Sequence, residues 1–372
     1  MIMQSAMLLG ACSTFETVIP NAEIPASTIT PTVPAAGAIP TPSSVPSVMP
    51  QPSPTTSSAP FRLIAVLDPN LAGRLQGLRT QSNDRVWVIA SEGISEWQNG
   101  SWSSLPVPTD VAVRDALFTQ SGDYWLVTRE GLYRLQDGDW VSVSPMEMGM
   151  PLPEEIDFVV FYTLAVDASE QVWVGRCDWV GPGPVGGNLR WYDGLAWHGA
   201  AAPADGGCVL ALAIDDAGGV WAGVDDAIWY HDQDAGTWTE YPLPETGESY
   251  RFGFVTDLAI DSDRVPWPYL APCGGASCDI AAGHRFRILG DAWDPVGEMN
   301  GSPQKLVFDG QGVGWLLTGT RLYRLEDHLA GAPPVAEELE VWAISVDPEG
   351  QVWVVGQWAD EPMALWVIEP RE

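Results

Sequence analysis

The chain has 372 residues with a formal net charge of −32, and 46% of its residues are hydrophobic. A charge of this size excludes nucleic acids and anionic membrane surfaces as electrostatically favoured partners. Beyond the N-terminus, no stretch approaches the roughly 18 apolar residues that a membrane-spanning helix needs. The composition therefore predicts a folded, exported protein that contacts a membrane only through an anchor.

An anchor is predicted at the N-terminus. Residues 1–12 end in Leu9-Gly10-Ala11-Cys12, which resembles the lipobox of bacterial lipoproteins, in which the cysteine is lipidated and becomes the mature N-terminus. A positively charged start is missing and the apolar run is short, so we expect the natural start to lie upstream. The alternative is an apolar N-terminus with no role in export.

Residues 13–60 are rich in Pro, Ser and Thr, and only Glu16 and Glu23 among them are charged. Such a segment cannot bury enough apolar surface to offset the entropy of ordering it. Its prolines favour an extended spacer, and Ser or Thr beside Pro suits O-glycosylation. We therefore expect a disordered stalk between a lipidated Cys12 and a folded region at 61–372.

The folded region repeats one unit, which is clearest at Val209–Pro242. Apolar runs cover 209–214, 220–224, 227–231 and 237–241, and Asp- and Gly-rich turns separate them. Four short strands joined by tight turns predict one antiparallel sheet. A single sheet cannot bury both faces, so the unit needs neighbours of its own kind.

Tryptophan marks the second strand of every unit. The central Trp recurs at intervals of 38 to 48 residues, at Trp87, Trp125, Trp173, Trp221, Trp267, Trp315 and Trp353. Six positions earlier stands Asp in five copies, and three positions earlier stands Gly in four: Asp167, Asp215, Asp261, Asp309 and Asp347; Gly122, Gly218, Gly312 and Gly350. A further Trp opens the fourth strand of five copies, at Trp102, Trp140, Trp197, Trp238 and Trp293. This period predicts an all-β, seven-bladed β-propeller of four-stranded antiparallel blades, with the Trp column as core and the Asp column capping turns.

The ends of the repeat array predict how the ring closes. The seventh unit stops after a third strand at Leu365–Ile368, whereas the apolar run Phe61–Leu67 precedes the first complete unit. We expect Phe61–Leu67 to supply the missing fourth strand, because closure removes exposed sheet edges.

Three copies, VLALAIDDAGGVWAGV, AISVDPEGQVWVVG and LFTQSGDYWLVTREGLYRL, follow the order apolar–Asp–x–x–Gly–x–apolar–Trp most closely. This order resembles the two-component-regulator-type propeller repeat, and the likeness covers about residues 70–368. Val265–Pro268 departs from it, so a distorted blade is expected there. In large sensors these repeats form an extracytoplasmic sensing region, which is the role that the resemblance implies.

Long insertions follow the second strand of copies three and five, at Arg176–Gly187 and Ala271–Gly283. In an up-and-down blade such insertions emerge on the same side as the connections between blades, whereas the Asp turns lie on the opposite side. Binding residues concentrate in loops on a rigid scaffold. The rim is therefore the predicted binding surface, with the segments 206–208, 249–253 and 357–361.

Five side chains on this rim are candidate ligand contacts. Trp179 and Trp358 fall in rim loops outside the Trp column and suit stacking on a glycan or a partner side chain, with loop packing as the alternative. Arg129, Arg176 and Arg251 lie near the rim in a chain with few cations, and suit an anion or a glycan carboxylate. The alternative for the arginines is pairing with neighbouring acids, namely Glu130, Asp178 and Glu248.

Asp225 is the sixth candidate contact on the rim. The pair Asp225-Asp226, together with Asp178, is better placed to hold a cation than the Asp column, because calcium needs several oxygens converging on one point. A solvated turn is the alternative. No metal site or cofactor is predicted, and only a structural calcium ion is left open.

Apart from Cys12, the cysteines are Cys177, Cys208, Cys273 and Cys278. An even count in an exported domain predicts disulfides. We expect Cys177 to pair with Cys208 across adjacent blades, and Cys273 to pair with Cys278 within one loop. One zinc site built from all four, or free thiols, are the alternatives.

No catalytic signature is present in the sequence. The pattern G-x-S-x-G is absent, and no Ser or Cys nucleophile pattern stands beside the histidines, which are His198, His231, His284 and His328. Streptogramin lyases are seven-bladed propellers thought to use a histidine base and a metal, and His284 is the rim histidine that such an enzyme would need. Sialidase-like propellers carry a turn that Asp216-x-Gly218-x-x-Trp221 matches only without its Ser.

The sequence thus favours a monomeric, non-catalytic module outside the cytoplasm, lipid-anchored to a bacterial membrane and binding a protein or carbohydrate ligand through its rim. The alternatives are a propeller-based lyase or glycan hydrolase, and a sensor or scaffold component of a membrane complex. An enzyme should show a tight polar pocket with convergent carboxylates or histidines, and a binder a broad, shallow rim with exposed aromatics.

Overall fold

The computed structural model divides by its contacts into two units, Met1–Thr56 and Ser57–Glu372. All residues whose placement is described belong to the second unit, so the predicted lipobox and stalk lie outside them. The described residues are 61–68, 71, 73–82, 84–108, 111–150, 156, 158–180, 183–200, 207–225, 227–242, 253–274, 277–278, 284–289, 292–295, 303–325 and 334–369. Side chains are described within these ranges except at 82, 158, 162, 179, 183–185, 253, 272–274, 277–278, 284, 292–295 and 303–304.

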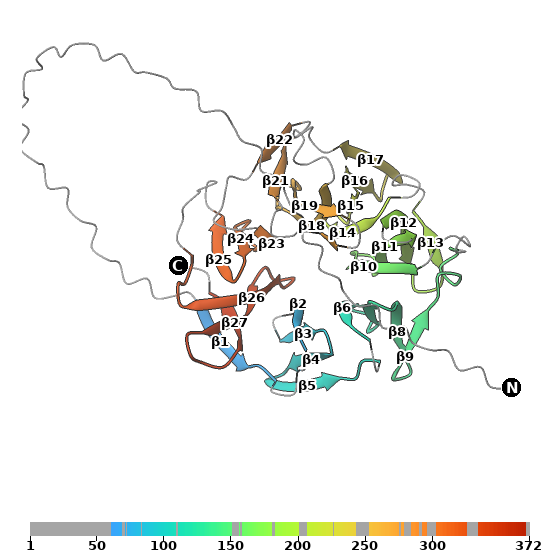
Figure 1. Cartoon of the computed structure of the whole chain (residues 1–372). Helices are drawn as coiled ribbons and strands as arrows, with labels where there is room; N and C mark the ends of the chain where they lie inside the picture. The colour runs from blue at the N-terminus through green and yellow to red at the C-terminus, as the bar shows by residue number, and fades with distance from the viewer. Residues whose placement is uncertain are drawn as a thin grey trace, which may run out of the picture. The chain divides into compact units, whose positions relative to one another are not determined.

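Seven antiparallel sheets stand around a common centre as the blades of a propeller, and the first strand of each blade lies innermost (Figure 1). The inner strands are β2 (Leu75–Ser82), β6 (Val113–Phe118), β10 (Phe158–Val166), β14 (Val209–Ile214), β18 (Gly253–Ile260), β23 (Pro303–Phe308) and β26 (Leu339–Val346). The second strands are β3 (Arg85–Ala90), β7 (Tyr124–Thr128), β11 (Val172–Val180), β15 (Val220–Val224), β19 (Pro266–Gly274), β24 (Gly314–Thr318) and β27 (Val352–Trp358).

The outer half of each blade follows the same order. The third strands are β4 (Gly93–Gln98), β8 (Leu132–Gln136), β12 (Gly183–Tyr192), β16 (Ala227–Asp232), β21 (His284–Leu289), β25 (Arg321–Leu325) and β28 (Ala364–Ile368). The fourth strands are β5 (Ser101–Leu105), β9 (Asp139–Val143), β13 (Trp197–Gly199), β17 (Thr237–Pro242), β22 (Ala292–Pro295) and β1 (Phe61–Val66), while β20 (Ser277–Cys278) pairs with β19. The described part of blade 6 gives three strands, and no helix occurs among the described residues. The predicted all-β, seven-bladed propeller is confirmed.

Strands from the two ends of the described chain complete blade 7. β1 pairs antiparallel with β28, with Phe61 opposite Ile368 and Val66 opposite Ala364. The backbone amide of Leu67 extends this pairing by donating to the carbonyl of Met363 at 2.9 Å. β1 therefore covers the edge of β28 that would otherwise be exposed, as the sequence led us to expect.

The Asp and Trp columns form one hydrogen-bonded unit. In blade 4, Oδ1 of Asp215 accepts the backbone amides of Ala217 at 3.0 Å and Gly219 at 2.8 Å, while Oδ2 accepts the indole Nε1 of Trp221 at 3.1 Å. The same indole bond, at 2.8 to 2.9 Å, recurs in the four other copies that carry the Asp: Trp173 to Asp167, Trp267 to Asp261, Trp315 to Asp309 and Trp353 to Asp347. No column Trp is more than 7% exposed. Both predictions, a capping Asp and a core Trp, are confirmed.

The position three residues before the column Trp takes a left-handed backbone. The four predicted glycines there have φ between 78° and 95°. In blades 3 and 5 the same position holds Glu170, at φ 63°, and Arg264, at φ 60°. Both side chains reach the preceding blade: Glu170 accepts the amide of Ser121, and Arg264 pairs with Asp216 at 3.0 Å. These two blades therefore accept backbone strain and gain a contact between blades.

Blade 5 is distorted at its prolines, as expected. β19 pairs with β18 along its length, but β21 pairs with it only at Tyr269 and Leu270. Pro268 has no amide to donate to a third strand. The carbonyl of Trp267 instead accepts the buried guanidinium of Arg285 at 2.7 Å. A side-chain donor thus satisfies a carbonyl of β19 beside the proline.

Candidate functional site

The turns between second and third strands share one side of the ring with the connections between blades. In blade 4, the amide of Asp225 donates to the carbonyl of Cys208 ahead of β14, and its own carbonyl accepts the amide of Val255 from blade 5. Arg129 contacts Ala112 in the same way in blade 2. We call this side the hairpin face and the opposite side, which carries the Asp215-type turns, the Asp-turn face.

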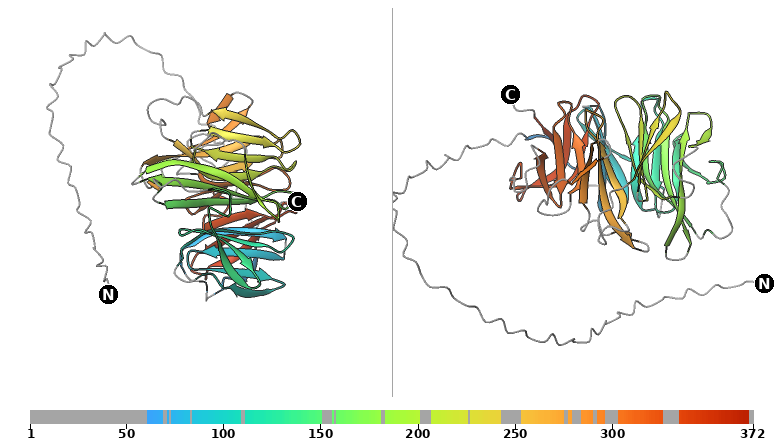
Figure 2. Two further views of the ribbon diagram at one scale, coloured as in Figure 1. Left: turned by 90° about the vertical axis from the view of Figure 1, so that its right-hand side faces the viewer. Right: turned by 90° about the horizontal axis from the view of Figure 1, so that it is seen from above.

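The hairpins of blades 3 and 5 are longer than the others. β11 runs to Val180, seven residues past Trp173, whereas β15 ends at Val224, three residues past Trp221. The insertion at Arg176–Gly187 is therefore not the irregular loop that we expected, because strand pairing continues through it. Figure 2 shows these strands extending beyond their neighbours on one side of the ring.

Trp179 lies within this extension. It pairs with Phe158 on β10 and with Pro184 on β12, so it is a strand residue and not a loop residue. Its side chain lies outside the description. The β-bulge between Asp178 and Trp179 marks where the extension departs from regular pairing, and such bulges re-aim side chains at the rims of sheets.

Arg176 is buried inside the extended hairpin. Its guanidinium pairs with Asp178 at 2.7 Å, which is the alternative we gave for it, and only 5% of the residue is exposed. Burial lowers the pKa of Arg176, and Asp178 opposes that shift. Burial also lowers the pKa of Arg190 on β12, with Arg176 adding repulsion. Arg176 is therefore an internal residue of the hairpin and not an exposed ligand contact.

A disulfide ties the extended hairpin to blade 4. Cys177 of β11 and Cys208 ahead of β14 are bonded, and each is 1% exposed. This predicted pair is confirmed, so the four cysteines do not form one zinc site. The amide of Cys208 donates to Oδ1 of Asp225 at 2.8 Å. Asp225, at φ 45°, is thus a turn residue that fixes the Cys208 segment.

The remaining rim candidates have different surroundings. Arg129 follows β7, is exposed, and makes no ion pair with another described residue. Trp358 ends β27 and is half-buried against Phe61 and Trp366, with ring centroids 6.2 Å and 5.9 Å away. That contact is the packing alternative we gave for Trp358. Arg251 lies outside the described residues.

The second predicted disulfide falls where only the backbone is described. Cys273 of β19 stands directly opposite Cys278 of β20 in an antiparallel pair. Their side chains lie outside the description, so the bond between them stays a prediction. The backbone register places the two cysteines as neighbours across a short hairpin.

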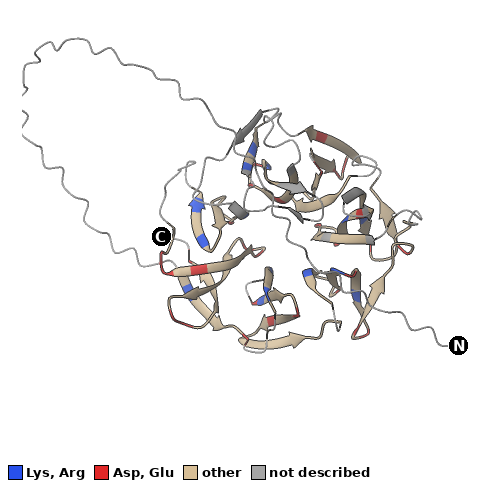
Figure 3. Cartoon of the chain, viewed as in Figure 1, with Lys and Arg blue, Asp and Glu red and all other residues tan. Residues whose placement is uncertain are grey.

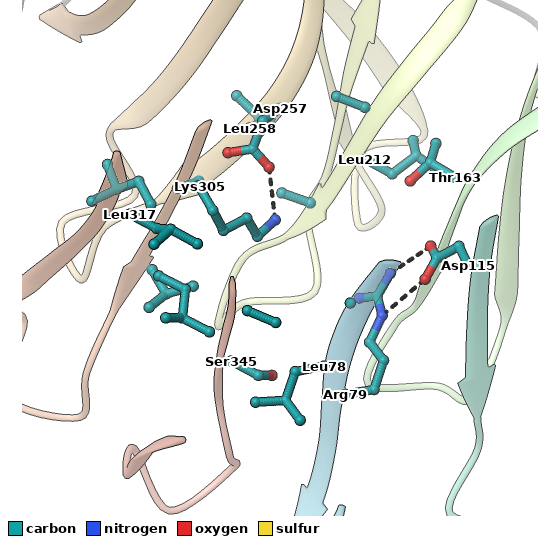
Figure 4. Close-up of a pocket in the computed structure, with 18 of the residues that line it drawn as sticks. Leu78, Arg79, Asp115, Thr163, Leu212, Asp257, Leu258, Lys305, Leu317 and Ser345 are labelled. Carbon is teal, nitrogen blue, oxygen red and sulfur yellow. Dashed lines mark hydrogen bonds and ion pairs between the residues drawn. The ribbon is translucent and has the colours of Figure 1, made fainter. Parts of the chain in front are cut away.

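The centre of the ring holds a cavity of about 580 Å³, lined by the inner strands of all seven blades. Two ion pairs stand on its wall, on opposite sides in Figure 4. Arg79 of β2 donates to Asp115 of β6 through Nε at 3.2 Å and through a terminal nitrogen at 2.6 Å. Lys305 of β23 pairs with Asp257 of β18 at 2.7 Å, and the buried Arg285 pairs with the same carboxylate at 2.7 Å.

Each inner strand carries a β-bulge that orients these side chains. The register against the second strand shifts at the same point in all seven blades, at 75/77, 113/115, 161/163, 209/211, 255/257, 303/305 and 341/343. The residue after the bulge is small or uncharged in four blades: Gly77, Thr163, Ala211 and Ala343. It is charged in the other three, where it is Asp115, Asp257 or Lys305.

Neighbouring charges hold Asp257 and Arg79 in their ionic forms. Although burial alone would raise the pKa of Asp257, Lys305 and Arg285 together bring it below its ordinary value. Asp115, and more weakly Asp257, raise the pKa of Arg79. The cavity therefore presents fixed charges.

Sequence reasoning missed these cavity residues. The signal was available in the repeat itself, because Asp115, Asp257 and Lys305 occupy the position four residues before the capping site, where other copies have Gly, Ala or Thr. Arg79, the partner of Asp115, stands two residues past the equivalent position on β2 and carried no comparable signal. Trp342, which also lines the cavity, escaped notice because it falls outside both Trp columns.

The described histidines lie away from the cavity. His198 on β13 pairs with Asp193 at 2.7 Å, and His231 on β16 packs against Trp238. His284 begins β21, a third strand, and its side chain lies outside the description. Within the described ranges, no group of three or more His, Cys, Asp or Glu is arranged to hold a metal ion. The same ranges contain no helix long and apolar enough to cross a membrane.

Comparison with known proteins identifies the fold. No protein-family model matches the chain, and no curated protein does. Virginiamycin B lyase from Staphylococcus aureus is 14% identical with a TM-score of 0.54, over 84% of this chain and 100% of that one. The extracellular domain of a putative hybrid two component system from B. thetaiotaomicron is 14% identical with a TM-score of 0.55, over 84% of this chain and 40% of that one. YCF48 bound to a D1 peptide is 13% identical with a TM-score of 0.51, over 84% of this chain and 97% of that one. At these identities the likeness shows the propeller fold alone.

Proposed function

We propose that this chain is a non-catalytic binding or sensing module that acts outside the cytoplasm and takes a protein or glycan ligand on its hairpin face. The observation that carries the proposal is the unequal construction of that face. The hairpins of blades 3 and 5 extend past the short hairpin of blade 4, while the Asp-turn face repeats one plan in five blades. Variation confined to one side of a rigid scaffold is typical of a binding surface.

Preorganisation of the hairpin face supports this proposal. The Cys177–Cys208 disulfide, the buried Arg176–Asp178 pair and the Asp225 turn fix the base of the extended hairpin. A surface that is ordered before binding loses less conformational entropy when it binds. The exposed Arg129 on the neighbouring blade adds a cation to an acidic protein and suits an acidic group on the ligand.

The location outside the cytoplasm is part of the same proposal. A buried disulfide between adjacent blades suits an oxidising compartment. Extracellular sensor domains share the propeller fold, and the lipobox-like ending at Cys12 suits attachment to a bacterial membrane by lipid alone. We propose a monomer. Radiolabelled palmitate incorporated by the natural chain, and lost in Cys12→Ser, is the expected sign of the anchor.

Affinity capture from the native envelope and culture medium tests the binding function. The full chain is the bait, and the variant bait carries Arg129→Ala with Trp179→Ala on the hairpin face. Arg264→Ala, at an exposed ion pair on the Asp-turn face, is the matched control. We expect the wild type and the control to retain the same protein or glycan and the double variant to lose it. Equal retention by all three baits would contradict the proposal.

A further inference from the structure

We infer that the central cavity binds a small organic anion, namely a carboxylate carried on an apolar or aromatic body. This inference deepens the proposed function, because it gives a sensing module the chemical class of a signal molecule. It rests on the charge, exposure and shape of the cavity wall and on none of the hairpin-face residues.

The cations of the wall face the cavity more than the anions do. The side chains of Arg79 and Lys305 are 40% and 45% exposed, whereas those of Asp115 and Asp257 are 16% and 13% exposed. The carboxylates therefore lie against the wall, and the nitrogens stand in front of them. In Figure 4, Lys305 reaches from β23 toward the middle of the cavity.

The net charge of the wall is opposite to that of the protein. The cations that line the cavity outnumber the anions by one, and Arg285 behind Asp257 adds another positive charge: the lining residues are Arg79, Arg114 and Lys305 against Asp115 and Asp257. The chain as a whole carries −32. Figure 3 shows basic segments on β2 and β6 beside the centre of the ring. A cleft of one sign with low-dielectric walls concentrates ions of the other sign, so this cavity favours anions.

Apolar side chains form the smaller part of the wall and suit an apolar body on the ligand. β14 contributes Leu210 and Leu212, and β26 contributes the half-buried Trp342. At about 580 Å³ the cavity falls within the usual size range of small-molecule sites, and more of its wall is polar than apolar. A carboxylate on an aromatic ring satisfies both parts of this wall.

Binding should rearrange the ion pairs without breaking the ring. A ligand carboxylate near Lys305 can share the Lys305 ammonium group with Asp257. Asp257 stays paired during this rearrangement, because Arg285 remains bonded to it. Arg79 keeps Asp115 through one of its two hydrogen bonds while another nitrogen turns to the ligand. Arg79 and Lys305 can therefore each donate to an incoming anion while keeping an aspartate partner.

Three phenyl probes of similar size, with acetate as the carboxylate alone, separate charge from apolar contact. Isothermal titration calorimetry on the full chain would compare phenylacetate with 2-phenylethanol, 2-phenylethylammonium and acetate. We expect phenylacetate to bind most tightly, the alcohol and acetate to bind more weakly, and the ammonium ion not to bind. Equal affinity for phenylacetate and 2-phenylethanol, or no binding of phenylacetate at millimolar concentration, would overturn the inference.

Matched variants locate the site. Lys305→Met should weaken phenylacetate binding by about tenfold or more, because a hydrogen bond to a charged group is lost. Arg79→Gln should weaken it by a similar factor, while the glutamine amide can still donate to Asp115. Arg62→Gln removes the same charge from an exposed pair on β1 and should change nothing. Unchanged affinity in both cavity variants, with melting temperatures near wild type, would overturn the inference. If the envelope capture experiment still succeeds after such a result, the cavity inference fails alone and the proposed function of the hairpin face is unaffected.

Discussion

The two faces of this propeller are built from the same strands in different ways. On the Asp-turn face, five blades repeat one arrangement in which a carboxylate accepts the buried indole six residues on and also turn amides, two in blades 3 to 6 and one in blade 7. On the hairpin face, strand length, cysteines and charges differ from blade to blade. This difference indicates that the Asp-turn face supplies the stabilising contacts that the repeats have in common. The hairpin face can therefore vary from blade to blade. The predictions below test that division.

The largest effect should come from opening the ring, on which both faces depend. Deleting residues 61–66 removes β1 and leaves β28 as an unpaired edge in blade 7. We expect the melting temperature to fall by more than about 10 °C, or the protein to aggregate, because an apolar edge is exposed. Circular dichroism melts of the deletion and of a chain lacking residues 40–45, outside the strand, provide the comparison. An unchanged melt for the first would refute closure by β1.

The disulfide is the strongest single stabiliser that we assign to the hairpin face. Replacing Cys177 and Cys208 by serine should lower the free energy of unfolding by about 3 to 4 kcal/mol, because a long loop of the unfolded chain is no longer closed. Reductant should produce a similar loss in the wild type. Reductant that still destabilises the double variant would point to the pair Cys273 and Cys278. A reductant-insensitive wild type would contradict the bond.

A capping aspartate should matter more than an exposed one in the same blade. Asp215→Ala leaves two turn amides and the indole of Trp221 without their acceptor, and should cost about 2 to 3 kcal/mol. Asp234→Ala, at an exposed turn on the outer edge of blade 4, should change stability by less than about 0.5 kcal/mol. Urea denaturation measures both. Similar losses for the two variants would mean that the Asp column does not carry the stability of its face.

The smallest effect tests the strained turns of blades 3 and 5. Arg264→Gly relieves a positive φ and removes only an exposed ion pair, so stability should stay level or rise by up to about 1 kcal/mol. Gly218→Arg makes the reverse change in blade 4, at φ 86°, and should lower the free energy of unfolding by about 1 to 2 kcal/mol. A clear loss in Arg264→Gly would show that the contact with Asp216 outweighs the strain.

The uniform face could be predicted from the sequence and the variable one only in part. A fixed spacing between Asp215 and Trp221, repeated down the chain, is enough to indicate blades, turns and core. The pairing of Cys177 with Cys208 also followed from the blade count. The pairs Arg79–Asp115 and Lys305–Asp257 did not, because they join neighbouring blades through side chains whose direction depends on a bulge in each inner strand.

Trp179, Trp358 and Arg176 show why the rim was harder to predict. The insertion at Arg176–Gly187 was expected to be a loop, and its Gly and Pro residues favour that reading, yet β11 and β12 continue their pairing through Arg176 to Val180. Trp358 was assigned to a loop, whereas the closing strand gives it Phe61 as a packing partner. Arg176 is buried because its own strand carries Asp178 two residues away, on the same side.

The measurement that tests the division most directly places one bulky group on either face of a single blade. Glu361→Cys and Glu349→Cys are exposed positions of blade 7, on the hairpin face and the Asp-turn face respectively. Each thiol would be coupled to a large polyethylene glycol chain before envelope capture with the full-length protein. We predict that polymer at Glu361→Cys abolishes retention and polymer at Glu349→Cys leaves it intact. Retention lost only with polymer on the Asp-turn face would contradict the account.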